Sequence, residues 1–526
     1  MPRKFNVLQI GGTDLEYLFT HKPEVTWDYF DTQLFEFDSG YIDSIKEIVE
    51  ESGQFDLVFI QANLTDALTQ LLHIVSHPYN TLVDAQYWPS GYDELDLVQR
   101  YLIRPIHYDT TDDLHDKLIS ISFPGQYGDK VSPARTHIQS PSYIEVIHYG
   151  NREIQLKGHF GDELIPVLNW QQNLVYDKDK VIEVWPEFRT EGDVTLEYTF
   201  RLVSLNPEEG VLEKIVLSEE ELAEPLYLQR RPYTAYISTS VSVKGSGTVH
   251  IGAVHKRLSH IEFGHLLLGS HRFVDENREE FFYYFNPGDF KPPLNVYFSG
   301  YREAEGFEAY FLMNQLGAPF LLISDPRIQG GAFYLGSDTY ENGIKQVITD
   351  TLNQLGFKED DLILSGLSMG SFGALYYGAQ LNPKGINVGK PLVNVGTIAK
   401  NMKLLRPNDF ETSLDIALSP EHTMTESSQT NTDLKHIKDL DDKFWNVFSN
   451  SHISDTSIAI TYMKNDDYDQ SAFEDLLPVL SRHHVHLMNK AVPGRHNDDT
   501  STVVNWFMNF YHILLKDHFG RDNHAK

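Results

Sequence analysis

The sequence predicts a mixed α/β protein built from three parts, and three observations support this. Apolar, strand-like runs alternate with helical patterns near both ends of the chain, which is typical of parallel sheets covered by helices. Short β-branched and aromatic runs separated by turn residues fill the middle, which favours an antiparallel sheet. The length of 526 residues exceeds what one hydrophobic core supports. We place the boundaries at 1–141, 142–285 and 286–526.

The first part, residues 1–141, is predicted to be an open, Rossmann-like α/β domain. The stretch "KFNVLQIGGTDLEYLF" indicates a strand that turns at Gly11 and Gly12 into a helix, and residues 54–61 and 80–88 form further apolar runs. The turn suggests nucleotide binding, but it lacks the Gly-x-Gly-x-x-Gly pattern that cradles a pyrophosphate. We therefore interpret it as a tight strand-to-helix turn.

The middle part, residues 142–285, is predicted to be an antiparallel β-sandwich or jelly roll. Within it, "VKGSGTVHIG" is expected to form a hairpin around Gly245, Ser246 and Gly247. Exposed aromatic side chains on such a module can stack on sugar rings, so carbohydrate binding is one hypothesis for this part. The alternative is that its Tyr and Trp residues form the core.

The third part, residues 286–526, is again α/β in character. An amphipathic helix is predicted to end near Gly356, where a C-cap glycine belongs, and "TSTVVNWFMNFYHILLKDHF" is the last helix. The polar segment 419–433 resembles a mobile loop or cap.

Composition excludes several classes of protein. The 43 Lys and Arg against 75 Asp and Glu give a net charge of −32, which repels nucleic acids and anionic lipid head groups. The absence of cysteine excludes disulfides, thiolate catalysis and cysteine-based metal sites. Because the N-terminus lacks a signal-peptide pattern and no apolar run reaches transmembrane length, we expect a cytoplasmic protein.

The clearest chemical signal is Gly-x-Ser-x-Gly, formed by Gly366, Ser368 and Gly370. An apolar strand, "DLILSG", enters this turn and a helix, "GSFGALYYGAQL", leaves it. Such a nucleophile elbow exposes the serine hydroxyl at a helix N-terminus, where the helix dipole and the Met369 N–H favour an oxyanion. We therefore predict an α/β-hydrolase-like domain with Ser368 as nucleophile.

A serine nucleophile needs a base, which in this fold follows the serine and an acid along the chain. His496 fits best, because it lies in "VPGRHNDD" between the last predicted strand and the last helix. The alternatives are His483, His484 and His486 in "RHHVH", which also resembles a metal-binding tract. No comparable acidic cluster accompanies that tract, so we predict no metal site there.

The orienting acid is expected in "KNDDYD", the loop that follows the predicted strand "IAITYM". Asp466 is the first choice, Asp467 remains open because the two are adjacent, and Asp469 is the third candidate. The second oxyanion donor is expected in the loop after the strand at 294–298, at Gly300 and Tyr301.

Two neighbouring features bear on the same site. Arg302 could bind a carboxylate or phosphate, although a surface salt bridge is the alternative. The Gly-rich stretch at 325–337, "DPRIQGGAFYLGS", is expected to overhang the site.

Segments spread over nearly the whole chain resemble the second of the accessory secretory (Asp-type) proteins of the accessory Sec system of Gram-positive bacteria. They are "KFNVLQIGG", "GTVHIGAVHKRLSHIEFGHLLLGSHRF", "VYFSGYREAEGFEAYF", "LSGLSMGSFGALYYG", "YMKNDDYD" and "GRHNDDT", in the expected order. The catalytic domain of that family is similar to α/β-hydrolase esterases.

The resemblance implies O-acetylation of N-acetylglucosamine on serine-rich-repeat glycoprotein adhesins, together with support for their export. Ser368, Asp466 and His496 carry over as the triad, but the acid in the family can be glutamate, so Asp466 and Asp467 both stay open. No tightly bound cofactor is implied, and the acetyl donor is unknown, with acetyl-CoA as one candidate.

The implied partners are two sister accessory secretory proteins and the accessory Sec motor ATPase. The implied location is the cytoplasm, with peripheral contact to the membrane through the export complex. Two other functions compete: a non-catalytic scaffold or adhesin-binding subunit, and a carbohydrate acetylesterase, since transfer and hydrolysis share an acyl-serine.

Overall fold

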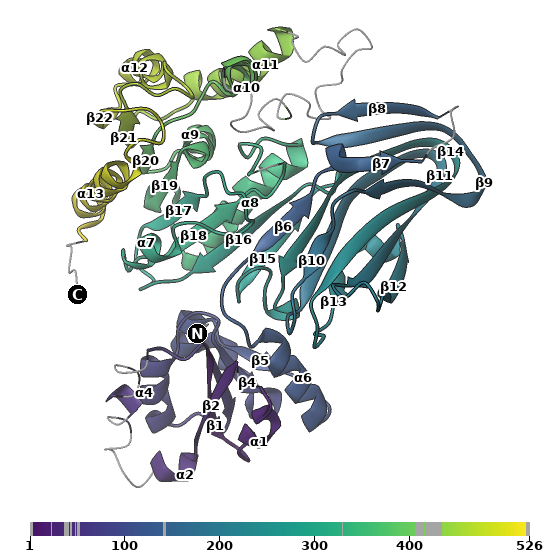
Figure 1. The fold of residues 1–526 in the computed structure, drawn as a ribbon. Helices are drawn as coiled ribbons and strands as arrows, with labels where there is room; N and C mark the ends of the chain where they lie inside the picture. Colours follow the sequence, from purple (N-terminus) through teal and green to yellow (C-terminus); the bar gives the residue numbers. More distant parts are fainter. Residues whose placement is uncertain are drawn as a thin grey trace.

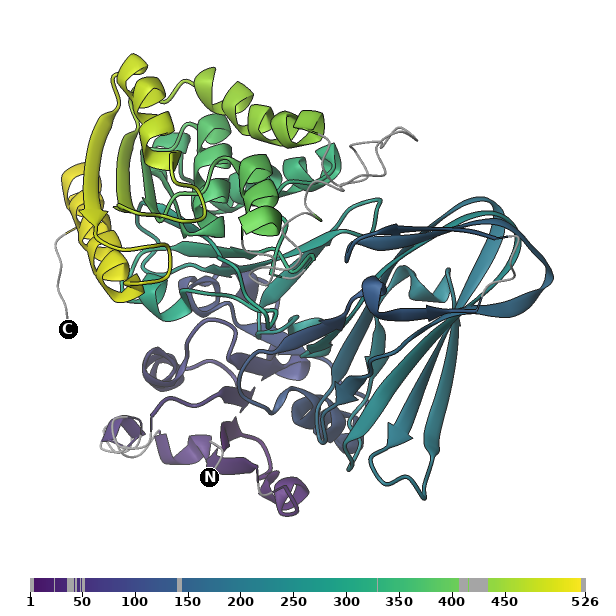
Figure 2. The same ribbon diagram turned by 45° about the horizontal axis from the view of Figure 1, so that its top comes forward.

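The computed structural model describes residues 4–22, 24–35, 53–139, 144–328, 330–405 and 434–521, together with residues 42, 45–47, 49 and 415. The described strands form sheets of five, nine and eight strands that follow one another along the chain. The second and third sheets lie side by side, with the first below them in the view of Figure 1; Figure 2 shows the same neighbours after rotation. The loop or cap predicted at 419–433 lies outside the described residues.

The first sheet is parallel, as the α/β prediction requires. Its order is β2-β1-β3-β4-β5, from strands β1 (Phe5–Gly11), β2 (Val25–Phe30), β3 (Leu57–Gln61), β4 (Thr81–Asp84) and β5 (Arg104–Ile106). The helices are α1 (Glu16–Phe19), α2 (Thr32–Phe35), α4 (Asp66–Val75), α5 (Asp96–Tyr101) and α6 (Thr111–Ile121). Leu72 of α4 packs with Leu8 of β1, and Leu118 of α6 packs with Val7, so helices cover both faces. This is the flavodoxin-like order of the doubly wound fold.

The second sheet is antiparallel, as predicted, and its strands form one hydrogen-bonded sheet. They are β6 (Gly128–Val131), β7 (Thr136–Ile138), β8 (Glu145–Tyr149), β9 (Glu153–Trp170), β10 (Leu174–Tyr176), β11 (Ile182–Ser204), β12 (Val211–Ser218), β13 (Leu226–Leu228) and β14 (Ala235–Leu258). Residues from both ends of the three long strands share one core, so the bent sheet encloses its own interior.

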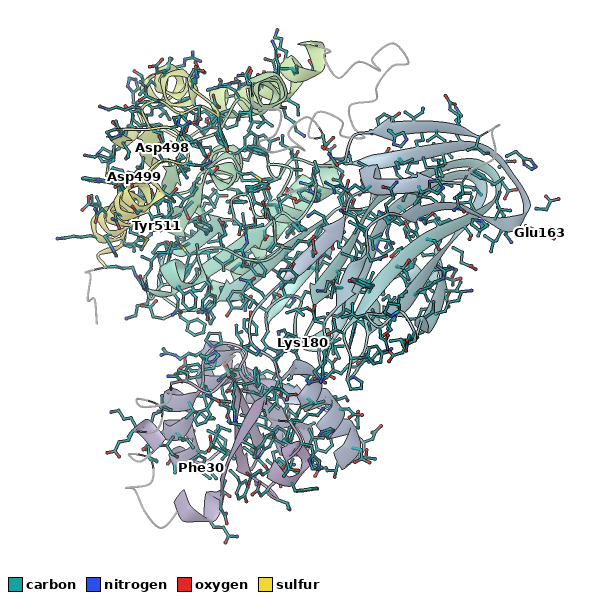
Figure 3. The ribbon with its side chains drawn as sticks, viewed as in Figure 1. Phe30, Glu163, Lys180, Asp498, Asp499 and Tyr511 are labelled. Atoms are coloured by element: carbon teal, nitrogen blue, oxygen red, sulfur yellow. The ribbon has the colours of Figure 1, made fainter. Side chains whose placement is uncertain are left out.

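The prediction of a hairpin around Gly245, Ser246 and Gly247 is wrong, because β14 continues through these residues as one strand. Glycines pair across the long strands here: Gly245 with Gly161 of β9, and Gly247 with Gly192 of β11. A Cβ on Gly245 would lie 2.2 Å from the Asp193 carbonyl oxygen, so a side chain is excluded. The glycines instead allow the strands to bend together at the outer end of the sheet, where Figure 3 labels Glu163.

The third sheet has the architecture predicted for an α/β hydrolase. Its order is β15-β16-β18-β17-β19-β20-β21-β22, and all neighbours from β18 onward are parallel. The strands are β15 (Ser270–Val274), β16 (Glu280–Asn286), β17 (Leu294–Phe298), β18 (Phe320–Ser324), β19 (Leu362–Leu367), β20 (Gly385–Gly389), β21 (Ser457–Met463) and β22 (His486–Val492).

Helices cover both faces of this sheet. They are α7 (Tyr310–Asn314), α8 (Asp338–Leu355), α9 (Met369–Leu381), α10 (Val395–Leu405), α11 (Leu434–Ser449), α12 (Ala472–Arg482) and α13 (Thr500–Phe519). Helices α8, α9, α11 and α12 pack into the core on one face, whereas α7 and α13 pack into the core on the other. Helix α8 is capped by Gly356 in a left-handed conformation, as expected from the sequence.

Sheet membership differs from the predicted boundaries in two places. Strands β6 and β7 precede residue 142 yet belong to the second sheet, and β15 and all of β16 except its last residue precede residue 286 yet belong to the third. The aromatic run "EFFYYFN" of β16 has the same β-rich composition as the strands before it, which explains why the change of sheet is not visible in the sequence.

Buried charges join the second and third sheets. The Arg257 guanidinium of β14 contacts the carboxylates of Glu183, Glu280 and Glu305, and all four side chains are buried. His255 Nδ1 lies 2.7 Å from Glu305 Oε1. Burial alone would raise the pKa of Glu305, but Arg257 and His255 hold it well below its usual range. Because Glu305 belongs to the segment after β17, these pairs fix the catalytic part against the second sheet.

Candidate active site

The sequence around Ser368 forms a sharp turn between β19 and α9. Ser368 has φ of 54° and ψ of −122°, a strained conformation for a residue with a side chain. A Cβ on Gly366 would lie 2.2 Å from the Gly370 carbonyl oxygen, and a Cβ on Gly370 would lie 2.0 Å from the Phe298 carbonyl oxygen. The motif therefore needs glycine at both fixed positions, as the nucleophile elbow predicts.

Ser368, His496 and Asp466 form one hydrogen-bonded series. Ser368 Oγ lies 2.8 Å from His496 Nε2, and His496 Nδ1 lies 2.8 Å from Asp466 Oδ2. Asp466 follows β21, and His496 lies between β22 and α13, so both stand at the carboxyl edge of the sheet with the serine. His496 is 1% exposed, and its hydrogen bond to Asp466 is buried, whereas the bond to Ser368 is part-buried at the pocket. The geometry is that of a serine, base and acid in contact.

The adjacent carboxylates have distinct contacts. Asp466 binds the imidazole with Oδ2, and its Oδ1 accepts the backbone N–H groups of Tyr468 at 2.9 Å and Asp469 at 3.3 Å. Asp467 instead accepts the backbone N–H of His496 at 3.0 Å. The strand end thus turns the two side chains in different directions, and Asp466 is the one that reaches the imidazole.

Asp469, the third candidate, lies in another part of the loop. It accepts the backbone N–H groups of Val393 and Asn394 at 2.9 and 2.8 Å. Burial raises the pKa of Asp469 despite these hydrogen bonds. Its contacts anchor the segment that precedes α10.

Tyr468 is a site residue that was not singled out in the sequence. Its ring stacks on the His496 imidazole with centroids 4.3 Å apart and an angle of 5° between planes. Asn497 Nδ2 donates to the Tyr468 hydroxyl at 3.1 Å. The tyrosine therefore holds the imidazole from one face. Its only signal in the sequence is its place in "NDDYD".

The predicted oxyanion donors have different surroundings. Met369 begins α9, where backbone N–H groups have no intrahelical acceptor. The Gly300 N–H donates to Glu308 Oε2 at 2.7 Å, so its hydrogen bond goes to a carboxylate and not to the oxyanion position. Tyr301, the next residue, lines the pocket. Among the described residues Arg302 forms no salt bridge; it donates to the Ala304 and Phe307 carbonyl oxygens.

A pocket of about 530 Å³ opens at Ser368. It is lined by Gly300, Tyr301, Glu303, Glu308, Phe333, Leu367, Ser368, Met369, Lys390, Leu392, Ile398, Tyr468, His496, Asn497 and Thr500. Phe333 belongs to the Gly-rich stretch predicted to overhang the site, which thus supplies one wall. Glu308 and Lys390 are charged wall residues that sequence reasoning missed, since Lys390 lies in no quoted motif and nothing in the segment around Glu308 marks that residue.

The alternative histidines lie elsewhere. His483 Nε2 is 3.3 Å from the Ser449 carbonyl oxygen, and His486 begins β22, at the end of that strand opposite to His496. Within the described ranges, no group of three or more His, Asp or Glu side chains is placed to hold a metal ion.

The turn at Gly11 and Gly12 lies beside side chains that hydrogen-bond to one another. The Gln9 amide donates to Gln61 Oε1 at 3.1 Å, and the Gln61 amide donates to Asp84 Oδ2 at 3.2 Å. A Cβ on Gly12 would lie 2.4 Å from Gln61 Oε1. Side chains therefore fill the crevice at the switch point of the first sheet, where doubly wound folds bind their ligands.

The elbow, the order of serine, acid and histidine, and the eight-stranded sheet define an α/β-hydrolase-like protein with the geometry of a Ser-His-Asp triad. The match to a protein family covers the other two sheets as well as this one. The chain belongs to the family of the second accessory secretory (Asp-type) protein, described as accessory Sec system GspB-transporter, whose model matches residues 5–521.

Relatives are similar over the full length. The chain is 54% identical to the accessory Sec system protein of this family from Staphylococcus aureus (strain NCTC 8325 / PS 47) over 526 residues, covering 100% of this chain and 99% of that one. It is 37% identical to the protein of the same name from Streptococcus gordonii, covering 99% and 100%. A solved structure, the Glycosylation Associate Protein (Gap123) complex from Streptococcus agalactiae, aligns with a TM-score of 0.88 and 32% identity over 99% of each chain.

None of the described helices combines the length and the apolar character needed to span a bilayer.

Proposed function

We propose that this protein O-acetylates N-acetylglucosamine on serine-rich-repeat glycoprotein adhesins and supports their export. The observation that carries the enzymatic part is the continuous series of contacts from Ser368 Oγ through His496 to Asp466. A serine hydroxyl becomes nucleophilic when a histidine takes its proton and an acid fixes the tautomer of that histidine.

The reaction proceeds in two halves. Ser368 Oγ attacks the acetyl carbonyl of the donor while His496 Nε2 takes the hydroxyl proton, and the Met369 and Tyr301 N–H groups stabilise the oxyanion. The donor's leaving group takes the proton from His496 and departs, which leaves acetyl-Ser368. A sugar hydroxyl then attacks the acetyl carbon, gives its proton to His496, and the proton returns to Ser368 Oγ.

The donor and the setting belong to the same proposal. Acetyl-CoA is a candidate donor that would act as a substrate, not as a resident cofactor. The proposed setting is the cytoplasm, with the two sister accessory secretory proteins and the accessory Sec motor ATPase as partners and with peripheral contact to the membrane through them. Membership of the family and the likeness to a chain of the Gap123 complex support this setting.

The test is mass spectrometry of adhesin glycans from cells that carry either the wild-type protein or Ser368→Ala. We expect the acetyl groups on N-acetylglucosamine to disappear in the variant. Ser365→Ala is a matched control, because Ser365 is buried in β19, the strand that leads to Ser368, and donates to the Val296 carbonyl oxygen. Normal acetylation by a folded Ser368→Ala protein would refute the enzymatic proposal.

A second function, as a scaffold of the export complex, is supported by one observation. Within the part of the chain that the structure describes, the residues that line the pocket all belong to the third sheet or its connections, and none comes from the first two sheets. The scaffold proposal predicts that the Ser368→Ala protein still co-purifies with its partners and still supports adhesin export. Loss of both would show that export depends on the chemistry.

A carbohydrate acetylesterase remains the alternative reaction, since water can replace the sugar as acceptor. The two are separated by incubating the protein with p-nitrophenyl acetate and methyl N-acetylglucosaminide. Transfer yields acetylated sugar, whereas an esterase yields acetate alone.

A further inference from the structure

Lys390 and Glu308 line the pocket beside Ser368 with opposite charges and do not pair with each other, and the exposed Glu303 lines the pocket as well. Lys390 follows β20 and is 5% exposed, and Glu308 is partly exposed at the loop after β17. Among the described residues, neither side chain forms a salt bridge. A buried ammonium and a partly exposed carboxylate that face the same pocket attract each other, so their separation is unfavourable unless a bound group lies between them.

The local structure holds each group in place. Lys390 has a left-handed φ of 51°, its N–H donates to the Thr461 carbonyl oxygen at 2.7 Å, and its Nζ donates to Thr500 Oγ1 at 3.2 Å. The Glu308 N–H donates to Ser299 Oγ at 3.2 Å, and its carboxylate accepts the Gly300 N–H. These contacts hold both charged groups in the wall of the pocket that contains Ser368.

Both groups keep unused hydrogen-bonding capacity. An ammonium has three donors and a carboxylate has about four acceptor positions, whereas the described contacts use one of each. Burial lowers the pKa of Lys390, and the charges of Asp466 and then Glu308 partly offset this effect. Burial raises the pKa of Glu308, and the Gly300 N–H, Arg302 and then Lys390 partly offset it. The pocket thus presents a donor and an acceptor that can each bind a further group.

We propose that Lys390 and Glu308 form the acceptor subsite, in which they bind neighbouring hydroxyl groups of a sugar. A hydroxyl both donates and accepts, so a pair of adjacent hydroxyls can accept from the ammonium and donate to the carboxylate. A purely anionic ligand would be attracted by Lys390 but repelled by Glu308. A cation would be attracted by Glu308 but repelled by Lys390. The subsite rests on the acyl-transfer function proposed above.

The subsite explains how transfer competes with hydrolysis. A sugar held by both charged groups occupies the space from which water would attack acetyl-Ser368. Its reacting oxygen forms a bond to the acetyl carbon while the bond from that carbon to Ser368 Oγ breaks. The hydroxyl proton passes to His496 Nε2 and then to Ser368 Oγ, so no further reactant is needed.

The first test measures binding without chemistry. Full-length Ser368→Ala protein is titrated with methyl N-acetylglucosaminide and followed by NMR, alone and combined with Lys390→Met or Glu308→Gln. Glu308→Gln keeps an oxygen for the Gly300 N–H while it removes the charge. We expect the dissociation constant to rise about tenfold or more in each double variant, since a hydrogen bond to a charged group is lost.

Matched controls are Lys516→Met and Glu474→Gln, which change exposed residues of α13 and α12. They should bind the sugar as Ser368→Ala does. Equal binding by Ser368→Ala and both subsite variants would overturn the subsite, and so would an absence of sugar binding by Ser368→Ala. If Lys390→Met weakened only coenzyme A or inorganic phosphate, the ligand would be anionic and the proposal would be wrong.

The second test measures partition in the active protein. Acetyl-enzyme is formed from p-nitrophenyl acetate, and acetylated sugar and acetate are quantified as methyl N-acetylglucosaminide is increased. We expect Lys390→Met and Glu308→Gln to need about tenfold more sugar for half of the acetyl groups to be transferred. If wild-type protein forms no acetyl-enzyme, the acyl-transfer function fails, while the NMR titration still decides the subsite.

Discussion

Replacing one of two adjacent carboxylates with its amide should separate their roles. In Asp466→Asn, Oδ1 would continue to accept the two backbone N–H groups of its loop, as the carboxylate does now. The amide nitrogen would then face His496 Nδ1, which lies 2.8 Å from Oδ2 in the native protein. Since an amide N–H cannot accept a proton, Nδ1 would have to become the acceptor. The ring proton would move to Nε2, and Nε2 could no longer take the proton of Ser368.

The size of the effect follows from this tautomer. Loss of the correct tautomer in a serine triad lowers kcat about ten-thousand-fold, equivalent to about 5.5 kcal/mol. Asp467→Asn should lower kcat by no more than about threefold, or about 0.6 kcal/mol, because the amide oxygen still accepts the His496 backbone N–H. The two variants have the same change of charge at neighbouring positions, so each is the control of the other.

The assay is the steady-state hydrolysis of p-nitrophenyl acetate, with thermal unfolding followed by circular dichroism to show that both variants fold. The reasoning is refuted if Asp466→Asn keeps more than about a tenth of the wild-type kcat. It is equally refuted if Asp467→Asn has the larger loss, because His496 would then be oriented through its backbone and not through its ring.

Three further changes test other parts of the structure. Gly370→Ala should abolish esterase activity and lower the free energy of unfolding by about 1–3 kcal/mol, because its Cβ would lie 2.0 Å from a carbonyl oxygen. The control is Gly385→Ala, whose Cβ would have its nearest contact at 3.3 Å and which should change activity by less than about twofold in the same assays. Arg257→Met should lower the free energy of unfolding in urea by about 3–5 kcal/mol, because three buried carboxylates lose their partner, and an effect below about 1 kcal/mol would contradict this. Burial lowers the pKa of His260 to about 3, so the folded state keeps this imidazole neutral while unfolded chains bind a proton below about pH 6.5. The free energy of unfolding should therefore fall by up to about 1.4 kcal/mol per pH unit as pH drops from about 6.5 toward 3, and His260→Gln should flatten the slope of Tm against pH over that interval.

The elbow could be predicted because its motif is local in sequence, and the candidate base because its position between two predicted elements follows the order of the fold. Ser368 is identified by glycines two residues away on each side, and His496 by its place between a strand and a helix. The choice between Asp466 and Asp467 needed coordinates, since a one-residue shift at a strand end reverses the direction of a side chain. The sequence alone left both open.

Long-range partners were beyond the reach of sequence patterns. Glu308 and Lys390 line the same pocket only because the loops after β17 and β20 both reach it. The bend of β14 was mistaken for a hairpin because glycine marks both a turn and a bulge, and only pairing with Gly192 and Gly161 distinguishes the two. The ends of the second sheet were misplaced for the related reason that β15 and β16 have the composition of their neighbours.

The charge cluster around Arg257 has a consequence for how the chain matures. Glu183, His255 and Arg257 leave the ribosome well before Glu305, so the nascent second sheet would emerge without the carboxylate that His255 and Arg257 share. A fragment that ends near residue 285 would carry the same deficit permanently. We therefore expect the second sheet to reach its final form only after Glu305 has been synthesised, and a fragment that lacks Glu305 to be less stable than the full chain.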